Sequence, residues 1–285
     1  MRHIPLLLVL ALTACRGERV GPPPITVFCG SASKPAMKHI AAAYQDETGV
    51  PVELMYGGSG TLLSQMTLAE KGDIYLPGSP DYIQLARRMG QIVPGSEATV
   101  AYLVPALIVP QGNPAGIAGL QDLAREGLRV GIGNPETVCL GLYGVEILEH
   151  NGLLDAVLPQ VVTFGASCSK TADLAAMGSV DVILGWRVFE AWNPSRMDLL
   201  PLEAGQAPRV STVPIAVSIH SPDPQRAQDF IDYVLSPVGQ QAYTDAGYIT
   251  DRDQALSLAP GAVIGGEYAL PADYMDRISG LGGDR

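Results

Sequence analysis

Four short segments of the sequence combine glycine with hydroxyl residues where an apolar run gives way to a helical pattern. They are CGSAS (29–33), GGSGT (57–61), NPETVC (134–139) and ASCSK (166–170). Glycine allows close backbone approach, hydroxyls donate hydrogen bonds, and the free N–H groups and dipole of a helix start favour an anion. One such segment alone is an ordinary helix cap. Four of them predict a ligand site to which the following residues contribute: Gly30, Ser31, Ser33, Gly58, Ser59, Thr137, Ser167 and Ser169.

Three cysteines, Cys29, Cys139 and Cys168, fall inside these same loops. If they converge, they would suit a thiophilic centre such as trivalent arsenic, Cu(I), Zn(II) or an iron–sulfur species. Two other interpretations stay open: a Cys139–Cys168 disulfide with Cys29 as a small buried residue, or three unrelated small residues. Glu136, in the third loop, is either a further metal ligand or a solvated carboxylate. The sequence indicates no organic cofactor.

The elements that must position these loops alternate between strand and helix. Apolar runs at 25–29, 50–58 and 73–78 each precede a helical pattern, and the same order returns between residues 128 and 186. This alternation predicts an α/β fold of two lobes, each a mostly parallel sheet flanked by helices, with the ligand in the cleft at the strand ends. We expect lobe 1 to comprise residues 25–105 and 211–285, and lobe 2 to comprise residues 106–210. A single extended segment (99–114) links the two, and one helix spans 222–247.

The N-terminus has the pattern of an export signal. A short basic start is followed by an apolar run at 4–12 that is too short to span a bilayer. LTAC resembles a bacterial lipobox, which implies a lipoprotein signal peptide at 1–14, lipidation of Cys15 and a tether at 15–24. A plain secretory signal is the alternative. Either places the protein in the periplasm or elsewhere outside the cytoplasm, and the lipobox adds a membrane anchor.

Bulk composition excludes several classes of function. The chain has 285 residues, 47% of them hydrophobic, and a formal charge of -11, so nucleic acid is not an expected partner. Catalysis is not expected either, because no histidine lies in any of the four loops and no nucleotide-binding fingerprint is present.

Three segments carry a family resemblance. The opening run ITVFCGSASKPAM…YGGSGTLLSQM, the run GSVDVILGW and the later AQDFIDYVLSPVGQQAYTDAGY are similar to the molybdate- and tungstate-binding proteins of ABC importers. The resemblance implies a type II periplasmic-binding fold and a monomer that delivers an inorganic oxyanion to an inner-membrane permease. It assigns ligand contact to Ser59 and puts Trp186 where the family has a contacting tyrosine. The position of the family's first-loop hydroxyl is occupied by Ala32, so Ser31 or Ser33 would have to take its place. A thiophilic metal or metalloid ligand, or a sensor coupled to a membrane kinase, is the alternative.

Overall fold

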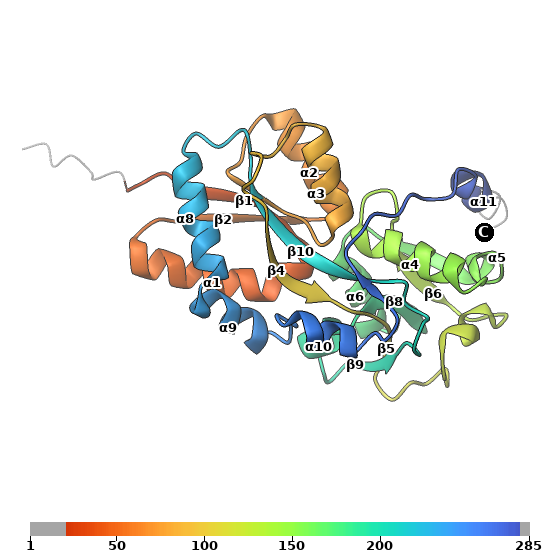
Figure 1. Ribbon diagram of the computed structural model, residues 1–285. Coiled ribbons are helices and arrows are strands. Elements are labelled where there is room, and N and C mark those ends of the chain that lie inside the picture. The colour runs from red at the N-terminus through yellow and green to blue at the C-terminus, as the bar shows by residue number, and fades with distance from the viewer. Residues whose placement is uncertain (1–20, 280–285) are drawn as a thin grey trace, which may run out of the picture.

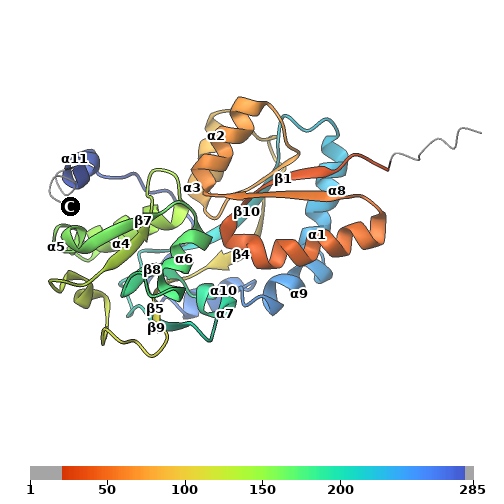
Figure 2. The same ribbon diagram turned by 180° about the vertical axis from the view of Figure 1, so that it is seen from behind.

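The computed structural model describes residues 21–279, which form two lobes, each built on its own sheet (Figures 1 and 2). The expected signal peptide and Cys15 lie outside the described residues. None of the helices in the described part of the chain is long and apolar enough to cross a membrane.

Lobe 1 is a six-stranded sheet in the order β11-β10-β3-β1-β2, with β4 paired to β10. Its elements are β1 (Ile25–Gly30), η1 (Ser31–Ser33), α1 (Lys34–Thr48), β2 (Val52–Gly57), α2 (Ser59–Ala69), β3 (Ile74–Leu76), α3 (Pro80–Arg88), β4 (Ala98–Leu103), β10 (Arg209–Val217), α8 (Pro224–Leu235), α9 (Pro237–Asp245), α10 (Arg252–Ser257) and β11 (Val263–Ile264). Strands β1, β2 and β3 are parallel, and Gly30 lies opposite Gly57. The loops that follow β1 and β2 are therefore neighbours.

Lobe 2 is a five-stranded sheet in the order β7-β6-β8-β5-β9. Its elements are β5 (Pro105–Pro110), η2 (Leu120–Ala124), β6 (Val130–Gly133), α4 (Cys139–His150), α5 (Leu154–Val157), η3 (Leu158–Gln160), β7 (Val161–Gly165), α6 (Cys168–Ala176), β8 (Val182–Trp186), α7 (Val188–Trp192) and β9 (Met197–Pro201). Parallel pairing of β6 with β7 sets Gly133 opposite Gly165, so the loops that lead into α4 and α6 are also adjacent.

Both sheets confirm the two-lobed α/β fold, and both include antiparallel strands as well as parallel ones. β10 runs antiparallel to β3 and β4, and β5 runs antiparallel to β8 and β9. The expected single linking strand is instead two strands that meet at Val104, one in each sheet, because β4 pairs with β10 while β5 pairs with β8. The expected helix at 222–247 is also two helices. Pro237 lacks an N–H and disfavours helical backbone at Ser236, which instead caps α9.

The C-terminal segment corrects the expected lobe boundaries. After β11 the chain returns to lobe 2, where α11 (Tyr274–Ser279) lies beside α5 at the far end of the molecule (Figures 1 and 2). Tyr274 is fully buried in a core cluster with Leu154 and Val157, and Arg277 pairs with Asp155 at 2.6 Å. Residues 211–285 therefore do not all belong to lobe 1, because burial of Tyr274 holds this segment against lobe 2.

Candidate functional site

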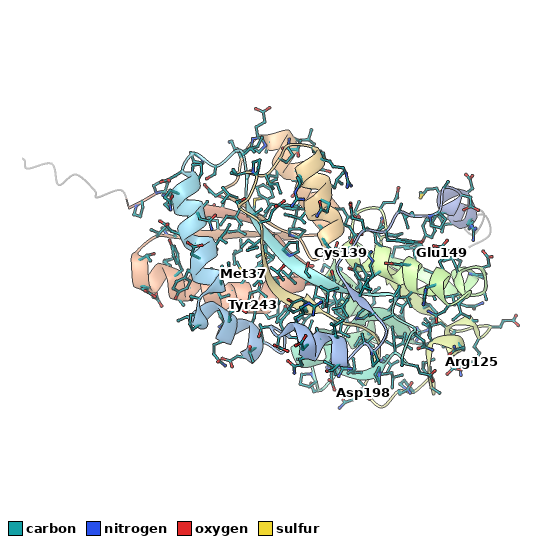
Figure 3. The ribbon with its side chains drawn as sticks, in the orientation of Figure 1. Met37, Arg125, Cys139, Glu149, Asp198 and Tyr243 are labelled. Carbon is teal, nitrogen blue, oxygen red and sulfur yellow. The ribbon has the colours of Figure 1, made fainter. Side chains whose placement is uncertain are left out.

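The strand-end loops of the two lobes touch one another directly. The backbone N–H of Gly60 donates to the Thr137 carbonyl at 2.9 Å. Ser169 N donates to Ser31 Oγ at 3.1 Å, and Ser169 Oγ donates to the Ser31 carbonyl at 3.2 Å. These bonds join the starts of α2 and α6 to the opposite lobe, so the lobes are closed on each other here. Figure 3 shows Cys139 at this junction.

Gly58 makes one of the tight approaches between the lobes. A Cβ added there would lie 2.7 Å from the Thr137 carbonyl oxygen and 3.0 Å from Val138 Cγ2. Its φ of −71° is ordinary for any residue, so glycine is required by space and not by backbone conformation. Gly58 therefore permits the lobes to close, which is a different role from the ligand contact that the sequence predicts.

Ser59 is the first residue of α2 and is held from two sides. Its Oγ accepts a hydrogen bond from Gly78 N at 3.1 Å, and its carbonyl accepts one from the Tyr75 hydroxyl at 2.8 Å. Because the Gly78 amide uses an acceptor position of Oγ, the Ser59 hydroxyl proton is available to donate. The Ser59 hydroxyl also lies close enough to Cys139 to favour its thiolate form.

Cys139 and Cys168 begin α4 and α6, and their Sγ atoms lie 3.9 Å apart as free thiols. The hydrogen bond between the two thiols lowers the pKa of Cys168, and the nearby Trp186 indole and the Leu140 backbone N–H act in the same direction. The same hydrogen bond, with burial, raises the pKa of Cys139. Cys168 is therefore the sulfur of the pair that more readily carries negative charge.

Cys29 does not join them, which corrects the expectation of three converging thiols. The strand β1 extends one residue further than predicted, so Cys29 lies within it and not in the loop. Its Sγ lies 3.6 Å from the carbonyl oxygen of the next residue, Gly30, and its neighbours include Tyr56 and Tyr243. Burial raises the pKa of Cys29 far above its ordinary value. Among the described residues, no group of three or more His, Cys, Asp or Glu is placed to hold a metal ion.

Trp186 ends β8 and is completely buried beside the thiol pair. Its ring packs edge-on against Tyr143, with centroids 5.0 Å apart. The Trp186 Nε1–H and the Tyr143 hydroxyl have no hydrogen-bond partner within the described protein. Two buried donors thus lie on the lobe 2 side of the junction, where an oxygen-bearing ligand would satisfy them.

The remaining predicted residues have other positions. Gly30 packs against the turn at Gly78, since an added Cβ would lie 3.1 Å from Gly78 N. Ser33 is fully buried near Tyr243, and Ser167 caps α6 by accepting from Lys170 N at 3.3 Å. The Glu136 side chain is exposed; only its carbonyl takes part in a contact between the lobes, from the Tyr82 hydroxyl at 3.2 Å.

Sequence reasoning missed a buried ionic cluster that also joins the lobes. Arg209 Nε lies 2.6 Å from Glu146 of α4, its Nη2 lies 3.1 Å from Asp81 of α3, and its Cζ lies 4.1 Å from the centroid of the Tyr143 ring. Arg209, Asp81 and Glu146 have side-chain exposures of 4%, 7% and 13%. These three residues, which we call the ionic clamp, connect both lobes through β10.

Gly78 and Tyr248 were missed as well. Gly78 follows β3, and an added Cβ would lie 2.7 Å from Cys139 Sγ. The Tyr248 hydroxyl donates to the Ala32 carbonyl. The segment PGSP at 77–80 has the same small-residue pattern as the four loops and marks Gly78, whereas nothing local in the sequence marks Tyr248.

Comparison with known proteins identifies the family. Residues 25–249 match the family described as bacterial extracellular solute-binding protein. The chain belongs to this family. It is 24% identical over 261 residues to the molybdate-binding protein ModA of Rhodobacter capsulatus, covering 86% of this chain and 94% of that relative. A binding protein of Haemophilus influenzae is 28% identical over 224 residues, covering 78% and 89%.

Among solved structures, the periplasmic molybdate-binding protein of Azotobacter vinelandii superposes with a TM-score of 0.69 at 20% identity. The match covers 80% of this chain and all of that one. The resemblance and the two-lobed periplasmic-binding fold are thereby confirmed, and this solute-binding protein is a divergent relative of the molybdate-binding proteins.

Proposed function

We propose that this solute-binding protein captures a small inorganic oxyanion of the molybdate and tungstate kind and delivers it to an ABC permease of the inner membrane. The supporting observation is the junction itself: loops from both lobes bring helix starts, the Ser59 hydroxyl and the unpartnered Trp186 N–H to one buried place. Donors of this kind bind oxyanions without a countercharge.

Closure accounts for affinity in this proposal. The residues at the junction are almost wholly buried, so solute enters only when the lobes part. Reclosure forms the Ser31–Ser169 and Gly60–Thr137 hydrogen bonds and excludes water around the solute, which strengthens each donor. The closed form would be the one that a permease recognises. The relatives named for molybdate support this choice of oxyanion.

Calorimetry with molybdate, tungstate and sulfate tests the proposal. Ser59→Ala should weaken oxyanion binding by about 1–3 kcal/mol, or roughly 5–150-fold in affinity, because a buried hydrogen-bond donor is removed. Ser257→Ala, at an exposed position on α10, is the matched control and should bind as the wild type does. Absence of heat with all three oxyanions, or equal affinity of Ser59→Ala and wild type, would contradict the proposal.

The lipid anchor is the second part of the proposal and rests on the LTAC sequence at Cys15. Cys15→Ala should move the protein from the membrane fraction to the soluble fraction of its host. An unchanged distribution, or an N-terminus cut elsewhere by mass spectrometry, would instead indicate the plain secretory signal.

A further inference from the structure

The spacing of Cys139 and Cys168 suits one shared ligand atom. Their Sγ atoms lie 3.9 Å apart. Two sulfurs each bound at about 2.3 Å to a tetrahedral centre would lie about 3.8 Å apart, and a pyramidal trivalent centre would draw them slightly closer, whereas a linear two-coordinate centre would need about 4.6 Å. The observed spacing therefore favours a centre with bent coordination over a linear one.

The groups around this pair are hydrogen-bond donors. The Ser59 hydroxyl, whose acceptor position is taken by Gly78 N, lies beside Cys139. The Trp186 indole lies beside Cys168, and its buried Nε1–H has no acceptor within ordinary hydrogen-bond geometry among the described residues. The thiol pair has no third cysteine and no carboxylate or imidazole that would form a metal site with it among the described residues. Donors cannot complete the coordination of a soft cation, but they do bind an oxygen atom that a ligand brings with it.

We propose that Cys139 and Cys168 bind a second class of solute covalently, a trivalent metalloid hydroxide of the arsenous acid kind, while Ser59 and Trp186 hold its remaining oxygen. This inference rests on the proposed function, capture of a small inorganic solute between the lobes. A neutral hydroxide also brings no charge into a site that closure seals from water, and it is not repelled by the net charge of -11.

The binding step balances without an oxidant or a reductant. Two arsenic–oxygen bonds break and two arsenic–sulfur bonds form. Each departing hydroxide takes one thiol proton, so two water molecules leave and arsenic stays trivalent. The third oxygen remains on arsenic as the hydroxyl that Ser59 and Trp186 contact. Cys168, the sulfur with the greater tendency to carry charge, is the first to attack.

Titration of the reduced mature chain with sodium arsenite, followed by calorimetry, tests this site. Cys139→Ser and Cys168→Ser should each weaken arsenite binding by at least about 100-fold, because two linked bonds become one. Cys29→Ala is the matched control and should bind arsenite as the wild type does, since Cys29 Sγ contacts the Gly30 carbonyl and does not group with the pair. Thermal unfolding of every variant checks that the fold is intact.

X-ray absorption of the wild-type arsenite complex gives a test that needs no variant. Two sulfur neighbours and one oxygen neighbour are expected; three sulfurs, or none, would overturn the assignment. Molybdate is titrated into the same protein. If molybdate gives a binding signal in calorimetry and arsenite gives none, this inference is overturned and the proposed function stands. If neither compound gives a signal, both the inference and the proposed function are refuted. Binding of Cu(I) but not arsenite would replace the metalloid with a soft cation and so also overturn the inference.

Discussion

Removal of Arg209 tests whether the ionic clamp holds the two lobes together. Arg209→Met keeps much of the apolar stem but leaves the Asp81 and Glu146 carboxylates, 7% and 13% exposed, without their cation. Removing one partner of a buried ion pair lowers the free energy of unfolding by about 3–5 kcal/mol. For a domain of this size, that loss corresponds to a decrease in melting temperature of roughly 6–20 °C.

The assay is thermal and urea unfolding of wild type, Arg209→Met and the triple variant Arg209→Met/Asp81→Asn/Glu146→Gln at pH 7. The triple variant should recover most of the loss, because it removes the two charges that Arg209→Met leaves uncompensated. Arg252→Met is the matched control: its arginine is 61% exposed and pairs with Asp253 at 3.5 Å, so it should unfold within about 0.5 kcal/mol of wild type.

The pH dependence gives the same test an internal check. Burial already raises the pKa of Glu146 in the wild type, against the opposing effect of Arg209. Without Arg209 that pKa rises further, so the folded state takes up a proton before the unfolded state does, and stability increases as pH falls through this range. The difference in unfolding free energy between the wild type and Arg209→Met should therefore become smaller between pH 7 and pH 5. A deficit below about 1 kcal/mol at pH 7, or one that the triple variant shares in full, would refute the clamp.

Three further predictions address closure, the first loop and surface charge. Gly58→Val should weaken solute binding and increase the radius of gyration seen by solution scattering, because a Cβ meets the Thr137 carbonyl at 2.7 Å; a fully closed variant would contradict the steric argument. Tyr248→Phe should lower the unfolding free energy by about 1–3 kcal/mol in urea titrations, because the buried Ala32 carbonyl loses its donor. Asp181→Asn should lower the free energy of unfolding by about 0.2–1 kcal/mol at pH 7. Arg129 lowers the pKa of Asp181 below its ordinary 3.8, so this cost should disappear as pH falls below that range, and a cost that persists there would exclude the ion pair as its source.

The fold was predictable because its signals are local. Each strand, small-residue loop and helix start lies within about twenty consecutive residues, and parallel pairing then brings the loops to one edge. The linking strand and the helix at 222–247 were predicted wrongly. In each case the boundary of the element is set by strand pairing or by a single residue. Val104 separates two strands only because each finds a partner in a different sheet, and Pro237 interrupts a pattern that is otherwise helical.

For the candidate site, the position of the backbone was predictable from the sequence, whereas the positions of the side chains were less so. Ser59, Cys139 and Cys168 lie where the loops placed them, whereas Cys29 does not, because one extra strand residue turns its side chain from the loop into the sheet. The ionic clamp could not be predicted. Arg209 is an ordinary arginine in PRVSTVP, and its partners lie 128 and 63 residues away in the chain. Only the closed arrangement of the lobes brings Glu146 of lobe 2 to the Arg209–Asp81 pair of lobe 1.

The three helices that meet at the junction share one design that explains how ligand chemistry can change without a change of fold. Ser59, Cys139 and Cys168 are the first residues of α2, α4 and α6, and each follows a strand-end loop. The helix starts supply backbone N–H groups whatever the first side chain is, so oxygen binding persists. That side chain alone decides between a hydroxyl that donates and a sulfur that bonds to a soft atom. Under the two proposals above, one serine in lobe 1 and two cysteines in lobe 2 would give this site both chemistries on an unchanged backbone.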